Sequence, residues 1–167
     1  EELDPKEVKK ARMEEVGEIH KHEVYVKRRI KQCWEVAGKA PIKTKWIDIN
    51  KGDDDNPNYR SSMVGKEFND REIEGLFAAT PPLEALRLLP SWVATSRVSP
   101  PGRVTKGSTE RKILIADVSR AFFEAPAKRD ICVELPEEAL GKGESTQDTV
   151  GKLLASLYGT RDASANW

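Results

Sequence analysis

The sequence is poor in the residue types that mark disulfide-rich, membrane-embedded or strongly basic proteins. It has only 2 cysteines among 167 residues, and its 28 Lys and Arg are matched by 28 Asp and Glu, so its formal net charge is zero. It contains no apolar run of about 18 residues, so we expect no membrane span. The charge balance argues against a globally basic nucleic-acid-binding domain but leaves room for a local basic patch.

The remaining composition favours a thin core under a large solvated surface, because 38% of the residues are apolar and 34% are charged. Cys33 and Cys132 belong to no metal or redox motif. We therefore predict two free thiols in a reducing environment.

Residues 1–36 are dense in charge and favour helix. Asp4-Pro5-Lys6-Glu7 is a good helix start, with an Asp cap and Pro at the first helical position. A narrow apolar stripe follows, which predicts one long helix or two that dock by that stripe. We take residues 1–42 as a charged helical N-terminal extension.

Residues 43–68 predict a β-hairpin. Residues 44–50 are rich in β-branched and aromatic side chains and predict the first strand. Residues 51–58 are dense in turn formers, and residues 59–68 would form the returning strand. A helix is predicted to open at Thr80. Because an interior proline is costly or forces a kink, either this helix breaks at Pro90 or the sequence is not well optimised there.

The last third predicts two strands and a helix. The apolar run Ile113–Ala116 is typical of a central buried strand, and Asp117 ends it. We expect a short turn or helix over 119–125, a strand over 131–135, a polar loop over 137–148 and a helix over 150–158. This order predicts an α+β fold, a mostly antiparallel sheet with helices on one side.

Asp117 carries the clearest chemical signal. A carboxylate at the end of a buried strand is costly unless it is paired or binds a cation. It either caps the next short helix or serves as a metal ligand held by a rigid strand.

Six segments resemble, in order, motifs of the reverse transcriptase of copia-type LTR retrotransposons. Residues 45–47 (KWI) resemble the family's K-W-V, residues 59–68 (YRSSMVGKEF) its Y-K-A-R-L-V-A-K-G-F, and residues 77–81 (FAATP) its F-A-P-V. Residues 86–89 (LRLL) resemble I-R-L-L, residues 117–123 (DVSRAFF) resemble D-V-K-N-A-F-L, and residues 157–167 (LYGTRDASANW) resemble L-Y-G-L-K-Q-A-P-R-A-W. The resemblance covers residues 45–167.

The resemblance implies that residues 43–167 are part of a reverse transcriptase domain, with the hairpin as the fingers followed by a partial antiparallel palm sheet. In such enzymes two Mg²⁺ ions assist nucleotidyl transfer. Asp117 would bind both ions and the Val118 carbonyl would be a further ligand. Backbone amides near Arg120 and Ala121 would meet the triphosphate, and Phe122 would exclude a 2′-hydroxyl by its bulk.

Further nucleotide contacts follow from the same resemblance. Arg60 and Lys66 would approach the phosphates of the nucleotide or template, unless they are only solvated hairpin charges. Asp162 replaces a glutamine that touches the incoming nucleotide in the family, and a carboxylate there would repel the triphosphate. We also expect Phe122 or Phe123 to pack in the core.

The family's Y-V-D-D hairpin, which supplies two further metal carboxylates, is not among these residues. One aspartate cannot hold two cations against their mutual repulsion, so we expect the chain alone to lack polymerase activity. The implied partners are an RNA or DNA template-primer, deoxynucleotides and the rest of the retrotransposon polyprotein, in a cytoplasmic virus-like particle or the nucleus. The alternatives are a non-catalytic nucleic-acid-binding remnant, whose hairpin cations would include Arg71, and a translated transposon remnant without function.

Overall fold

The computed structural model describes residues 3–53, 55–68, 81–94 and 112–167. Two compact units are present, the larger within residues 1–77 and 120–167 and the smaller within residues 78–119. Helices and antiparallel sheets together confirm the predicted α+β class. Among the described residues, no helix is long and apolar enough to cross a membrane. Arg71 and Phe77–Thr80, named in the sequence predictions, lie outside these ranges.

The larger unit begins as the capping signal predicts. Helix α1 spans Pro5–Lys21, and the Asp4 side chain accepts a hydrogen bond from the Lys6 N–H at 2.8 Å. Strand β1 (Tyr25–Arg29) then precedes helix α2 (Ile30–Ala37). The sequence predicted two helices at most here and missed β1, which starts just after Glu23 takes a left-handed φ of 50°.

A three-stranded antiparallel sheet has the order β1-β5-β4, with β4 at Cys132–Glu134 and β5 at Thr149–Leu153. The strand predicted over 131–135 is confirmed. The helix predicted over 150–158 is wrong, because β5 pairs with a strand on each side. Gly151 suits this position, since a Cβ there would lie 2.9 Å from the Tyr25 ring.

Helices cover both faces of this sheet, so the prediction of helices on one side is wrong. On one face, Val16 and Ile19 of α1 join a core with Tyr25 and Leu153. On the other, Cys33 of α2 packs with Cys132 and Val150. Alternate side chains of a strand point to opposite faces, and both faces here carry apolar residues that need cover.

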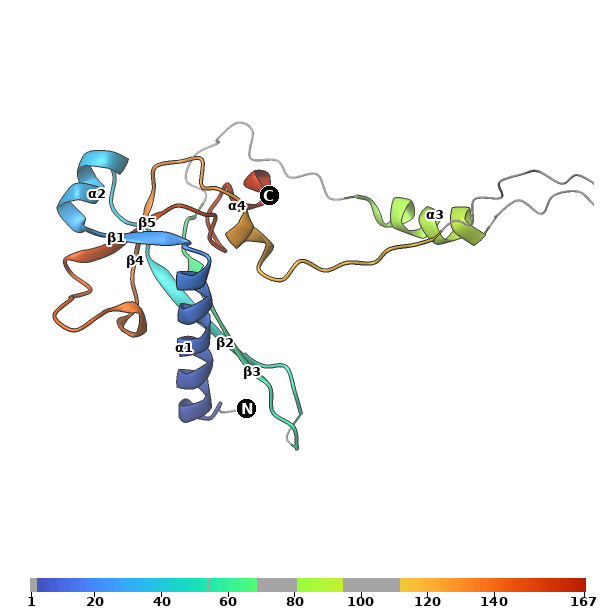
Figure 1. Ribbon diagram of the computed structural model, residues 1–167, viewed down its shortest axis with the longest axis horizontal. Coiled ribbons are helices and arrows are strands. Elements are labelled where there is room, and N and C mark those ends of the chain that lie inside the picture. The colour runs from blue at the N-terminus through green and yellow to red at the C-terminus, as the bar shows by residue number, and fades with distance from the viewer. Residues whose placement is uncertain (1–2, 54, 69–80, 95–111) are drawn as a thin grey trace, which may run out of the picture. The chain divides into compact units, whose positions relative to one another are not determined.

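The predicted hairpin is confirmed. Strands β2 (Thr44–Asn50) and β3 (Tyr59–Gly65) pair antiparallel, and α1 lies alongside them (Figure 1). The Asn50 side chain closes the turn by accepting hydrogen bonds from the N–H groups of Gly52 and Asn58 at 3.0 and 2.8 Å. Three short helical turns complete the unit: η1 (Ala121–Glu124), η2 (Glu137–Ala139) and α4 (Ala163–Asn166).

The smaller unit contains helix α3 (Leu83–Ala94), which continues through Pro90. The strand predicted over Ile113–Ala116 is wrong, because these residues have no regular secondary structure. Leu114 and Ile115 are 91% and 90% exposed. An apolar run becomes a strand only where another strand pairs with it, so Asp117 does not stand at a strand end here.

Gly159 gives the fold a direct test. It has a φ of 78°, and a Cβ there would overlap the carbonyl oxygen of Gly65. We expect Gly159→Ala to lower the free energy of unfolding by about 3 kcal/mol, through left-handed strain and a backbone overlap. Gly143→Ala is the matched control, because Gly143 has a φ of 85° but open space around it. It should cost only about 1 kcal/mol in urea denaturation, and equal losses would contradict the close packing at Gly159.

Candidate functional site

Three of the segments that carry the resemblance meet in the larger unit. The Gly65 N–H donates to the Tyr158 carbonyl at 2.7 Å, and the Glu67 N–H donates to the Gly159 carbonyl at 3.4 Å. The ring centroids of Phe122 and Tyr158 are 5.0 Å apart. Residues 59–68, 120–123 and 157–167 therefore share one region of the surface, which we call the junction.

The two phenylalanines at the junction have different environments. Phe123 is 3% exposed and packs against Tyr158 and His22, so the expectation that one phenylalanine lies in the core is confirmed. Phe122 is only partly buried, and its contact with Tyr158 orients the ring. Its role in excluding a 2′-hydroxyl stays a prediction.

Arg120 turns the chain into η1. It has a left-handed φ of 54°, and its guanidinium donates to the Glu15 carboxylate of α1 at 3.2 and 3.3 Å. Burial raises the pKa of Glu15, and the charges of Arg120 and Arg60 oppose that rise. The Arg120 side chain is thus committed to α1, and any contact with a triphosphate falls to the backbone of Arg120 and Ala121.

Arg60 and Lys66 are both exposed, Arg60 in β3 and Lys66 just after it. They are six residues apart, and a strand rises about 3.3 Å per residue, so their backbones are about 20 Å apart. Their approach to the phosphates of a nucleotide or template stays a prediction.

Asp162 lies in a buried ion cluster rather than in an open site. It is 5% exposed, and its carboxylate accepts hydrogen bonds from Arg129 Nη2 and, at 3.1 Å, from Asn166 Nδ2. The Arg129 guanidinium also donates two hydrogen bonds of 2.8 Å to Glu67. Glu67 accepts a further bond from the Arg161 N–H at 2.9 Å and lies 3.7 Å from Lys39 Nζ.

This cluster is ionised at neutral pH. Burial by itself would raise the pKa of Glu67 and of Asp162, but the hydrogen bonds from Arg129 outweigh it, so both pKa values lie below the ordinary range. The same bonds raise the pKa of Arg129. Sequence reasoning missed Arg129 and Glu67 as partners of Asp162, because no motif links residues so far apart in the chain.

A second ion cluster holds the hairpin against α1. Arg12 donates to Asp48 through Nη2 at 2.7 Å and through Nε at 3.2 Å, and to Glu138 through Nη1 at 3.0 Å. Its guanidinium lies 5.4 Å from the centre of the Trp46 ring, and Trp46 Nε1 donates to Glu138 at 3.2 Å. Hydrogen bonds from Arg12 lower the pKa of Asp48.

Asp117 and Val118 belong to the smaller unit, and both are exposed. Within the described ranges, no group of three or more His, Cys, Asp or Glu side chains is arranged to hold a metal ion. A carboxylate is a suitable ligand for Mg²⁺, but Asp117 alone does not form a two-ion site. These residues therefore do not complete the magnesium centre that the resemblance implies.

Comparisons of the chain with protein-family models, with curated proteins and with solved structures give no match.

We expect Arg129→Gln to lower the free energy of unfolding by about 3 kcal/mol at pH 7, because it removes the cation that pairs with buried Asp162 and leaves Glu67 with the more distant Lys39. The folded-state pKa values of Glu67 and Asp162 are lowered. The stabilisation is therefore fully present above their unfolded pKa of about 4 and is lost as pH falls through the folded values. Urea denaturation at pH 7 and pH 3.5 should show the wild-type advantage shrinking at the lower pH.

Arg28→Gln provides the matched control, since Arg28 is exposed on β1. It should change stability by less than about 0.5 kcal/mol at either pH. An Arg129→Gln effect of the same small size would show that the cluster does not stabilise the junction.

Proposed function

We propose that the chain is part of an RNA-directed DNA polymerase, the reverse transcriptase of a copia-type LTR retrotransposon. Residues 43–167 would form the fingers and the first part of the palm. In the intact enzyme they would contribute to two-metal nucleotidyl transfer on a template-primer. The enzyme would be released from a retrotransposon polyprotein and act in a cytoplasmic virus-like particle or in the nucleus.

The observation that carries this proposal is the junction. Residues 59–68, 157–167 and the last four residues of 117–123 belong to separate motifs, yet Gly65 bonds to Tyr158, and Phe122 packs on the same tyrosine. Motifs that build one nucleotide-binding region should meet in space, and these contacts are consistent with that.

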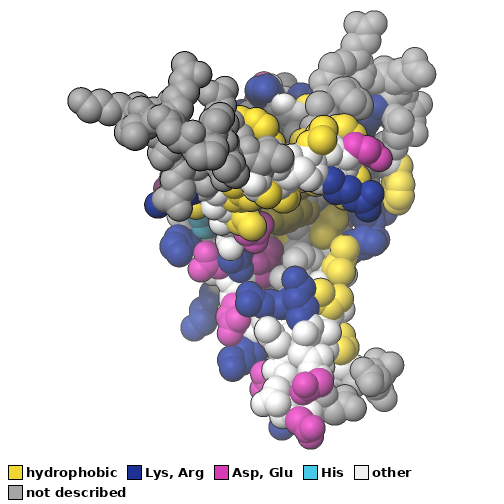
Figure 2. All heavy atoms as spheres, turned by 90° about the vertical axis from the view of Figure 1, so that its right-hand side faces the viewer, with side chains coloured by type: hydrophobic (Ala, Val, Ile, Leu, Met, Phe, Trp, Pro, Cys, Tyr) yellow, Lys and Arg dark blue, Asp and Glu magenta, His cyan; other side chains and the backbone are white. Residues whose placement is uncertain are grey.

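The outer face of the hairpin suits contact with a nucleic-acid strand. Lys45 and Arg60 are exposed there, and Ile47 and Ile49 between them are 42% and 41% exposed. Figure 2 shows Lys and Arg side chains interspersed with Asp and Glu over the lower part of the molecule, with hydrophobic side chains along one edge. Cations would bind phosphates, and the isoleucines would pack against sugars or bases.

Within the junction, the residues divide into contact and positioning roles. Phe122 and the backbone of Arg120 and Ala121 are assigned to the nucleotide. Both carboxylate oxygens of Asp162 already accept hydrogen bonds, so we assign Asp162 to positioning the segment after Tyr158. Asp117 keeps its role as a metal ligand, with Val118, on the resemblance alone.

Binding of a primer-template duplex tests the hairpin assignment. We expect the double variant Arg60→Gln/Lys66→Gln to bind an RNA–DNA duplex more weakly than the wild type in fluorescence anisotropy. The slope of log K against log salt should become shallower by about 1 to 2, because each lost phosphate contact removes about 0.9.

The matched control is Lys9→Gln/Lys142→Gln, which removes the same charge from two exposed lysines outside the hairpin. It should leave affinity and slope nearly unchanged. An equal loss in both double variants would mean that only net charge matters, and the hairpin assignment would be wrong.

The coding sequence that follows Trp167 tests the catalytic assignment. We expect it to encode two adjacent aspartates flanked by apolar residues. In a protein that includes that segment, Asp117→Asn should abolish magnesium-dependent primer extension. Asp130→Asn, which changes an exposed aspartate paired with Lys152 at 2.8 Å, should not. Extension that survives Asp117→Asn would contradict the role of Asp117.

The second candidate function is a non-catalytic nucleic-acid-binding remnant of a decayed element. The exposed hairpin cations Lys45, Arg60 and Lys66 favour it. It predicts duplex binding that Asp117→Asn leaves unchanged, together with a downstream sequence that lacks the paired aspartates.

A further inference from the structure

A disulfide joins Cys33 of α2 to Cys132 of β4, across 99 residues of sequence. The two Cα atoms are 6.3 Å apart, and each cysteine is 2% exposed. The prediction of two free thiols is therefore wrong in this structure. No sequence motif could predict this pair, because the two cysteines are far apart in the chain and come together only where α2 packs on the sheet.

Helix α2 depends heavily on this bond. Cys33 is its single fully buried residue, and Ile30 and Ala37 are only partly buried against the small cluster of Cys33, Cys132 and Val150. Trp34 is 50% exposed and contributes little to that cluster. An eight-residue helix is unstable by itself, so its attachment to the sheet determines whether it forms.

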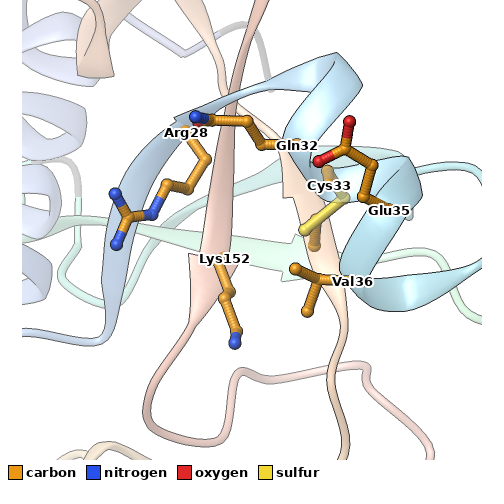
Figure 3. Close-up of a pocket in the computed structure, with 7 residues that line it drawn as sticks. Arg28, Gln32, Cys33, Glu35, Val36 and Lys152 are labelled. Atoms are coloured by element: carbon orange, nitrogen blue, oxygen red, sulfur yellow. A yellow bond between two sulfur atoms is a disulfide. The ribbon is translucent and has the colours of Figure 1, made fainter.

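The disulfide also borders a cavity of about 310 Å³. Figure 3 shows Arg28 and Lys152 on the strand side of this cavity and Glu35 on α2. Lys152 also pairs with Asp130 at 2.8 Å. The cavity gives a small thiol a route to the sulfurs. Arg28 and Lys152 belong to its lining, and a cation that approaches an attacked disulfide favours the thiolate that leaves.

We propose that Cys33–Cys132 is a reversible thiol–disulfide site that latches α2 onto the sheet. A low-molecular-weight thiol attacks one sulfur as its thiolate, and the Cys33–Cys132 bond breaks as a mixed disulfide forms. A second thiol then releases the mixed disulfide. The protein gains two electrons and two protons and ends with two thiols, while the reductant ends as its own disulfide. This proposal does not depend on the polymerase assignment.

Peptide mapping without reductant tests the bond. Trypsin should release residues 32–39 and 130–142 as one linked peptide, and a maleimide added in denaturant should label neither cysteine. Reduction with glutathione should separate the peptides, and oxidised glutathione should restore the link. Two maleimide adducts in protein that cannot be reoxidised to the linked form would overturn the proposal.

Hydrogen exchange tests the latch. Reduction should remove protection from the amides of α2 and leave those of α1 unchanged, and it should lower the Tm by at least about 5 °C. The Cys33→Ser/Cys132→Ser variant should behave like the reduced protein with or without glutathione. Retained protection of α2 in that variant or in the reduced wild type would overturn the latch.

Reduction kinetics test the part played by the cavity. Arg28→Gln should slow reduction by glutathione several-fold, because it removes a cation that favours the departing thiolate. Lys31→Gln, at an exposed α2 residue that does not line the cavity, should leave the rate unchanged. Equal rates in the wild type and Arg28→Gln would overturn the role assigned to the cavity cations.

Discussion

The fork of hydrogen bonds from Arg12 constrains how the hairpin lies against α1 in the larger unit. A two-stranded hairpin is marginal in water unless something packs against it, and α1 has only a narrow apolar stripe to offer. Beside the apolar contact of Met63 with the core, Arg12 adds an ionic attachment by binding Asp48 of β2 and Glu138 of η2 at once. An isolated surface ion pair contributes little. The Arg12–Asp48 pair is bidentate and partly buried, and the Arg12 guanidinium lies over the Trp46 ring.

The Arg129 cluster attaches the base of the hairpin to the rest of the unit, as Arg12 attaches the middle of strand β2. It ties Glu67, just after β3, to Asp162 near the end of the chain. Gly159 lies between these attachments with no room for a side chain. Two arginines therefore set the position of the hairpin, and the junction of motifs follows from that position. The same hairpin presents Arg60 and Lys66 to solvent, where they are available to a phosphate backbone.

The thin core explains why ionic clusters and a disulfide matter so much. The three-stranded sheet is short, and among the described residues α2 covers its second face through a few apolar side chains. Polar and covalent links supply attachments that a larger core would provide by burial alone. Such links respond to conditions, since carboxylates protonate at low pH and a disulfide opens under reduction, so the stability of this unit should vary with both.

Local sequence signals were sufficient for the start of α1, the β2–β3 hairpin and β4, since capping, turn residues and β-branched runs act over a few neighbouring residues. They were insufficient for Ile113–Ala116 and for β5. The apolar run at Ile113–Ala116 and the leucine spacing over 150–158 do not show whether a partner strand is present. Pairing with a partner strand determines whether such a segment becomes a strand. The ordered motifs predict that several segments form a nucleotide-binding region, and the contacts among three of them depend on tertiary packing. Only the tertiary structure could pair Arg129 with Asp162 or Cys33 with Cys132, because these partners are brought together by the sheet and not by their spacing in the chain.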